Sequence, residues 1–70
     1  MEKEFRDFIK ELKGEYKIFF IQNSVSRNWK AEYQGEKEGT FKFGAIDHHE
    51  IFDLADMCIA KGFNTLLMRK

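Results

Sequence analysis

The chain has 70 residues, and its 12 Lys and Arg residues balance its 12 Asp and Glu residues, so that its formal net charge at pH 7 is zero. This length predicts one domain, over residues 1–70, with marginal stability. Zero net charge excludes a bulk electrostatic attraction toward nucleic acid or an anionic membrane. Eight Phe, two Tyr and one Trp compensate for the small size, because aromatic rings bury the most area per residue.

The cellular location follows from what the sequence lacks. No uninterrupted apolar run is longer than four residues, which is too short to cross a bilayer. The start, Met1 to Glu4, has neither the basic residues nor the apolar core of a signal peptide. A single cysteine, Cys58, excludes an intramolecular disulfide. We therefore expect a cytoplasmic protein without membrane contact.

The first predicted element is an amphipathic helix that ends at Lys13-Gly14, a cation followed by a residue that enters the left-handed conformation freely. Charged residues separate its apolar positions, which follow helical spacing: Met1, Phe5, Phe8, Ile9 and Leu12.

The second predicted element is a strand from Glu15 to Asn23. Because side chains alternate between the faces of a strand, Ile18 and Phe20 point to one face and Phe19 and Ile21 to the other. A chain this short covers one sheet face easily, but covering both is hard. The second apolar face is therefore expected to be a partner's binding site, a dimer contact, or a face covered by another part of the chain.

Two further strands are predicted after the turn at Gln22 to Ser24. The first runs from Val25 to Tyr33 and places Val25, Trp29, Ala31 and Tyr33 on one face, with Arg27 as an exception on that apolar side. A loop from Gln34 to Gly39 follows. In the second, Phe41, Phe43 and Ala45 alternate with Thr40, Lys42 and Gly44. Three such strands form a meander.

The second helix carries the clearest local signal. Asp47 is a favourable N-cap, and Glu50 is placed to bond back to it in a capping box; Lys61-Gly62 ends the helix. A short strand from Phe63 to Met68 completes the chain, with Arg69 and Lys70 fraying. The predicted core is Phe5, Phe8, Ile9, Leu12, Ile18, Phe20, Trp29, Tyr33, Phe41, Phe43, Ile51, Leu54, Ala55, Cys58 and Ile59.

These elements predict an α+β domain in the order α-β-β-β-α-β. The sheet is mostly antiparallel, and the two helices pack on one face because each has one apolar stripe. If the last strand lies beside the first and parallel to it, the first strand becomes central and the strand order is 4-1-2-3.

Enzyme chemistry is not expected, because no base, nucleophile and orienting group assemble from this sequence. Cys58 lies in an apolar helix stripe, where a thiol behaves as a small hydrophobe. His49 and Asp53 are spaced four apart as weak candidate metal ligands, but the simpler interpretation is a capped helix with a solvated acidic face. No cofactor is expected.

The α-β-β-β-α order resembles that of double-stranded-RNA-binding domains. The resemblance implies an accessory module that binds nucleic acid, here through the strand residues Arg27, Lys30 and Lys42. In that family, lysines at the start of the second helix grip phosphates. Here that place holds Asp47-His48-His49-Glu50, which repels phosphate, so nucleic acid is the second choice of partner.

Protein binding has the best physical motive, because an exposed apolar patch usually marks an interface. We expect Phe19 and Ile21 on the face away from the helices, beside either Leu66 and Met68 or Thr65 and Leu67. Lys17, Lys30 and Lys42 belong to the polar rim. An alternative acidic interface is Glu50, Asp53 and Asp56.

The small size, the helix-meander-helix order and the lack of catalytic motifs are also similar to those of small phage-encoded inhibitors, including some anti-CRISPR proteins. That similarity implies a protein that acts by occupying a partner's surface. The expectation is thus a protein-binding inhibitor or adaptor, with self-association into a homodimer left open.

Overall fold

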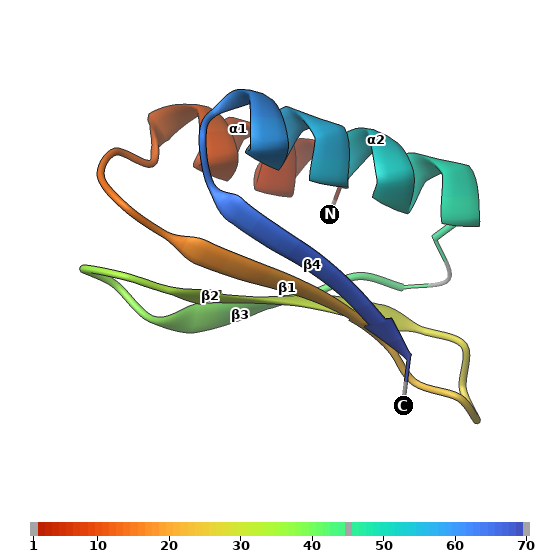
Figure 1. The fold of residues 1–70 in the computed structure, drawn as a ribbon. Coiled ribbons are helices and arrows are strands. Elements are labelled where there is room, and N and C mark those ends of the chain that lie inside the picture. The colour runs from red at the N-terminus through yellow and green to blue at the C-terminus, as the bar shows by residue number, and fades with distance from the viewer. Residues whose placement is uncertain (1, 45, 70) are drawn as a thin grey trace.

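The computed structural model describes residues 2–44 and 46–69, and expectations for Met1, Ala45 and Lys70 lie outside them. The elements occur in the predicted order (Figure 1). They are α1 (Glu2–Glu11), β1 (Lys17–Gln22), β2 (Trp29–Gln34), β3 (Gly39–Lys42), α2 (His48–Ala60) and β4 (Asn64–Arg69). The fold is therefore α+β, as the sequence predicts.

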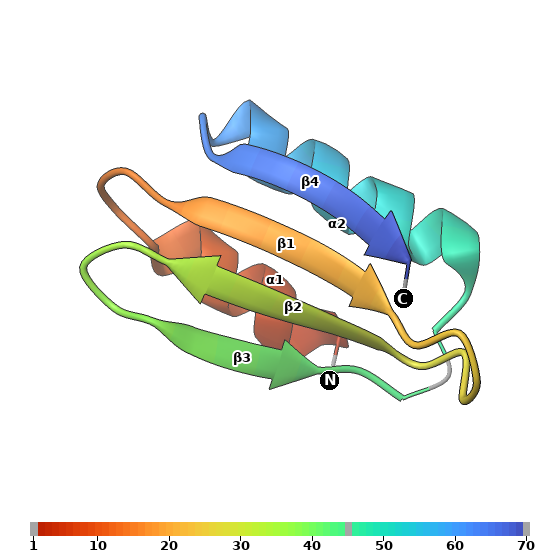
Figure 2. The same cartoon turned by 60° about the horizontal axis from the view of Figure 1, so that its bottom comes forward.

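One four-stranded sheet has the order β3-β2-β1-β4, which is the predicted order read from the opposite edge. The β1–β2 and β2–β3 pairs are antiparallel, whereas β1 and β4 are parallel, so the sheet is mixed. Both helices lie on the same face, with α1 over the β2–β3 side and α2 over the β4 side (Figures 1 and 2). The other face carries no helix.

Phe5 lies at the centre of the core between α1 and the sheet. Its ring packs edge-on against Phe41 and Phe43, at centroid distances of 5.2 Å, and against Phe20 at 5.7 Å. Most of the predicted core is confirmed as buried: Phe5, Ile9, Leu12, Ile18, Phe20, Trp29, Phe43, Ile51, Leu54, Ala55 and Cys58. Phe8, Tyr33 and Phe41 are partly buried against it.

Tyr16 and Phe63 are core residues that the sequence reasoning missed. Each directly precedes one of the two parallel strands, and their rings meet edge-on at 5.6 Å. The Asn64 N–H donates to the Tyr16 carbonyl at 3.1 Å, so the two strand entrances are joined by a backbone bond as well. The pair closes the end of the core where β1 and β4 begin.

The predicted strand start at Val25 is wrong, because residues 23–28 form a turn and β2 begins at Trp29. The Asn23 carboxamide oxygen accepts from the Val25 N–H at 2.8 Å and the Ser26 N–H at 3.0 Å. Arg27 is left-handed, with φ of 64°, and its N–H donates to the Asn23 carbonyl. Val25 is consequently 91% exposed instead of facing the core.

The ends of the last helix and strands also differ in detail. Gly62, at φ of 87°, ends α2 in a Schellman motif, since the Phe63 N–H donates to the Cys58 carbonyl and the Gly62 N–H to that of Ile59. β3 ends at Lys42, earlier than predicted. β4 includes Arg69, which was predicted to fray.

Candidate protein-binding surface

The face of the sheet without helices is built from alternate residues of each strand. Phe20 packs under Phe5, so its neighbours Phe19 and Ile21 point to the opposite face. Phe19 pairs with Glu32 on one side and Leu66 on the other, and Ile21 pairs with Lys30 and Met68. The register thus selects Leu66 and Met68, one of the two predicted pairs, as neighbours of Phe19 and Ile21.

We define the open-face patch as Phe19, Ile21, Leu66 and Met68. Leu66 and Met68 are exposed and Phe19 is half-buried. Ile21 is only 4% exposed, so the expectation that it is open to solvent is wrong. It lies on the central strand between the longer side chains of Lys30 and Met68, near the end of the turn at Asn23, and these neighbours cover it.

The predicted lysines of the rim do not lie together. Lys30 and Lys42 are directly opposite each other on β2 and β3, at the Ile21 end of the patch. Lys17 is at the other end of β1, between Gln34 and Asn64. Arg27 lies in the turn, not on a strand, which separates it from the predicted basic strip.

The two lysines at this end of the patch, Lys30 and Lys42, differ in their ion pairing. Lys30 forms an ion pair with Glu32, with Nζ 2.9 Å from Oε1. Lys42 has no ion-pair partner within residues 2–44 and 46–69. Two like charges directly opposite on adjacent strands repel, so an acceptor group brought by a ligand would be stabilised here.

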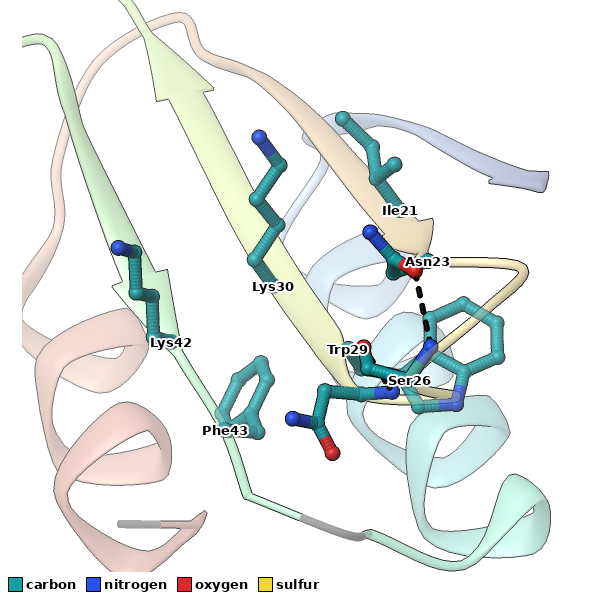
Figure 3. A pocket seen from close by; sticks show the side chains of 8 residues that line it. Ile21, Asn23, Ser26, Trp29, Lys30, Lys42 and Phe43 are labelled. Atoms are coloured by element: carbon teal, nitrogen blue, oxygen red, sulfur yellow. Dashed lines mark hydrogen bonds between the residues drawn. The ribbon is translucent and has the colours of Figure 1, made fainter. Parts of the chain in front are cut away.

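A shallow depression lies beside the two lysines (Figure 3). Its lining residues are Ile21, Asn23, Ser26, Asn28, Trp29, Lys30, Lys42 and Phe43. The Asn23 carboxamide oxygen is already occupied by the Ser26 N–H, as the dashed line in Figure 3 shows. The depression therefore combines apolar walls with ammonium donors, which suits an acidic side chain next to an apolar one.

A wider apolar feature borders β4 and shares Leu66 and Met68 with the open-face patch, and the sequence reasoning missed its extension onto α2. Of the six exposed large hydrophobic residues in the described chain, five gather here and only Val25 lies elsewhere. We call these five the β4 edge strip: Phe52, Ile59, Leu66, Leu67 and Met68. They are between 37% and 57% exposed.

The strip includes two α2 residues, Phe52 and Ile59, and the sequence analysis assigned Ile59 to the core. Ile51 and Cys58 lie over the sheet, and one residue further along, about 100° around the helix, Phe52 and Ile59 turn outward. The sheet ends at β4, so nothing lies beneath that flank of the helix. The prediction of Ile59 as core is therefore wrong. This error has a recognisable cause, because a central β1 leaves β4, and the helix flank above it, at an edge.

The start of α2 is capped, but not by the full predicted box. The Asp47 Oδ1 accepts from the His49 N–H at 2.8 Å, which confirms Asp47 as N-cap. The Glu50 backbone N–H donates to the Asp47 carbonyl, but the Glu50 carboxyl does not accept from the Asp47 N–H; it faces Glu2 of α1, and the negative charge of Glu2 raises the Glu50 pKa. The predicted acidic interface is divided as a result, with Asp53 and Asp56 on the exposed side of the helix.

The candidate metal and thiol chemistry has no support in the geometry. Nowhere in residues 2–44 and 46–69 do three His, Cys, Asp or Glu side chains gather as ligands for a metal ion. His49 and Asp53 are exposed, while His48 packs on Trp29 and Phe52 at 5.6 and 4.7 Å between ring centroids. Burial raises the pKa of the Cys58 thiol to about 12.

Comparisons of the chain with family models, with curated proteins and with solved structures find no match. Neither helix that the structure describes is long and apolar enough to cross a membrane. Inference about function therefore rests on the surface itself.

Proposed function

We propose that this protein is a non-enzymatic binding module, an inhibitor or adaptor, whose open-face patch contacts a protein partner. The observation that carries the proposal is the helix-free sheet face with Phe19, Leu66 and Met68 in adjacent register positions. Exposed apolar side chains in one cluster are costly to leave in water and commonly mark an interface.

The rim supports the same proposal and suggests the partner's chemistry. Lys42 and Lys30 lie at one end of the patch, beside the depression in Figure 3. A partner segment that places a carboxylate at Lys42 and apolar side chains on Leu66 and Met68 would relieve the repulsion between the lysines and bury the patch. Such an apolar centre with a charged rim is the usual anatomy of a protein interface.

The proposal is tested by affinity capture from a lysate of the source organism, with wild-type protein and two variants as baits. Phe19→Ser removes the open-face anchor that lies on the central strand, away from the sheet edge. We expect this variant to keep its fold by circular dichroism and to lose the protein that wild type captures. Anchors of this kind contribute about 2 kcal/mol, so its affinity should fall by at least about tenfold.

Val25→Ser is the matched control. It also removes one exposed apolar side chain, but from the turn at residues 23–28, away from the patch. It should capture the same protein as wild type. Equal capture by a folded Phe19→Ser protein and by wild type would contradict binding through this face.

A further inference from the structure

The two edges of the sheet differ in how open they are to another strand. β3 has four residues, and it includes Gly39 and Lys42. β4 has six, and Arg69 is its one charged residue. Short, charged edges resist pairing with other chains, whereas long apolar edges invite it. Of the two edges, β4 is the one without these protections.

The backbone groups that β4 offers follow from its pairing with β1. The Asn64 N–H donates to the Tyr16 carbonyl, so Asn64 points its backbone groups toward β1. Because these groups alternate along a strand, Leu66 and Met68 also point toward β1. Thr65, Leu67 and Arg69 therefore point their N–H and C=O groups outward, past the edge of the sheet.

We propose that a second copy of this chain pairs with β4, antiparallel to it, with Leu67 opposite Leu67 at the two-fold axis. The proposal goes beyond the function proposed above and does not depend on it. The axis is perpendicular to the sheet, so that both copies keep their helices on the same side. The two four-stranded sheets join into one of eight strands.

The register is chosen by the hydrogen bonds. With Leu67 opposite itself, Thr65 of one copy lies opposite Arg69 of the other, and all three outward residues of each strand exchange both of their backbone bonds. Moving the axis to Leu66 pairs Thr65 with Leu67 and leaves Arg69 opposite Phe63, outside the strand. Only the Leu67 register uses every outward N–H and C=O of β4.

In this register, apolar side chains of one β4 strand meet apolar side chains of the other. On the open face, Leu66 of each copy meets Met68 of the other, which joins the two open-face patches into one. On the helix face, the two Leu67 side chains meet at the axis, and Phe52 on the outer flank of α2 lies close to Leu67 and faces the other copy. The pairing therefore covers apolar side chains on both sides of the sheet.

Charge also favours a second copy as the occupant. Arg69 of one copy lies opposite Thr65 of the other copy. Thr65 is at the start of β4, which lies beside the C-terminal half of α2 in the same copy (Figure 1). The last turn of α2 holds no basic residue, and the Lys61 ammonium that follows it donates to the Lys10 carbonyl of α1, so the negative end of the α2 dipole favours a further cation. Asp56, on that exposed side of α2, adds a negative charge. No like charges lie opposite each other between the two β4 strands.

The test changes Leu67, the residue that lies opposite its own copy in the proposed pairing. Leu67→Lys places two lysines directly opposite each other across the axis, and Leu67→Glu places two glutamates there, which repel in each case. By sedimentation velocity at about 100 µM, wild type should have the mass of two chains and each variant the mass of one. A mixture of the two variants should recover the mass of two chains, because the lysine introduced in one then faces the glutamate introduced in the other.

Control variants distinguish a dimer through β4 from a monomer and from a dimer through another surface. A Val25→Lys control, which adds the same charge away from the strip, should remain dimeric like wild type. Circular dichroism establishes that each variant is folded, and Leu66→Lys, at an exposed open-face position, replaces Leu67→Lys if that protein unfolds. A monomeric wild type overturns the proposal, and so does a dimer that survives both Leu67→Lys and Leu66→Lys. Monomeric wild type with Phe19-dependent capture would leave the proposed function standing alone.

Discussion

At the scale of single residues, Cys58 shows how burial sets chemistry. The thiol is fully buried under α2, and burial raises its pKa from the ordinary 9.0 to about 12. Since the thiolate is the reactive form, Cys58 should resist alkylation in the folded protein. We expect a disulfide exchange reagent at pH 8 to label Cys58 only as fast as the protein unfolds.

The same shift predicts a pH dependence of stability. In the unfolded chain the thiol ionises near pH 9, whereas in the folded protein it keeps its proton to about pH 12. The contribution of Cys58 to the free energy of unfolding is therefore complete below pH 9 and falls between pH 9 and about 12, by about 1.4 kcal/mol per pH unit. Urea titrations at pH 8 and 10 measure the free energy of unfolding at each pH. The Cys58→Ala variant should lack the part of the decline that comes from the thiol.

Asp47 gives a second test at this scale. Its Oδ1 holds the His49 N–H at the start of α2, and Asp47→Ala should lower the free energy of unfolding by about 1 kcal/mol. Asp47→Asn keeps the acceptor while removing the charge, and it should lose much less in the same urea titration. Equal losses in the two variants would show that the charge matters and the cap does not.

At the scale of elements, the sequence was sufficient where local signals agreed with the whole fold. Asp47 and Gly62 begin and end α2 as predicted, because a cap acceptor and a left-handed glycine act within one turn. The predicted order made β1 central on the condition that the last strand lies beside it and parallel to it, and the two-sided apolar pattern of β1 agreed with that order, which the structure has.

The errors arose where the deciding contacts are tertiary or depend on a side chain. Alternation alone extended β2 back to Val25, but the Asn23 side chain gathers two backbone N–H groups and makes a turn instead. Periodicity likewise assigned Ile59 to the core, although the sheet ends before reaching it. Ile21 was placed on the right face, and only the packing of the neighbouring strands reveals that its neighbours cover it.

At the scale of the whole molecule, the apolar surface is concentrated on one side. The core fills the space between helices and sheet, and all but one of the exposed large hydrophobic residues in the described chain border β4. Phe19 and Ile21, the interface candidates predicted from the sequence, lie at the margin of this apolar surface, and the edge strand β4 lies at its centre. The proposed pairing through β4 depends on this contrast between one protected edge and one apolar edge.

Amide hydrogen exchange along β4 tests this account most directly, because the two sets of amides in one strand report on different neighbours. The N–H groups of Leu66 and Met68 face β1, and those of Thr65, Leu67 and Arg69 face outward. We predict that exchange at Thr65, Leu67 and Arg69 slows by at least about tenfold when the protein concentration rises from about 10 µM to about 1 mM, as binding protects them. Outward amides that exchange rapidly at every concentration, beside protected amides of Leu66 and Met68, would contradict it.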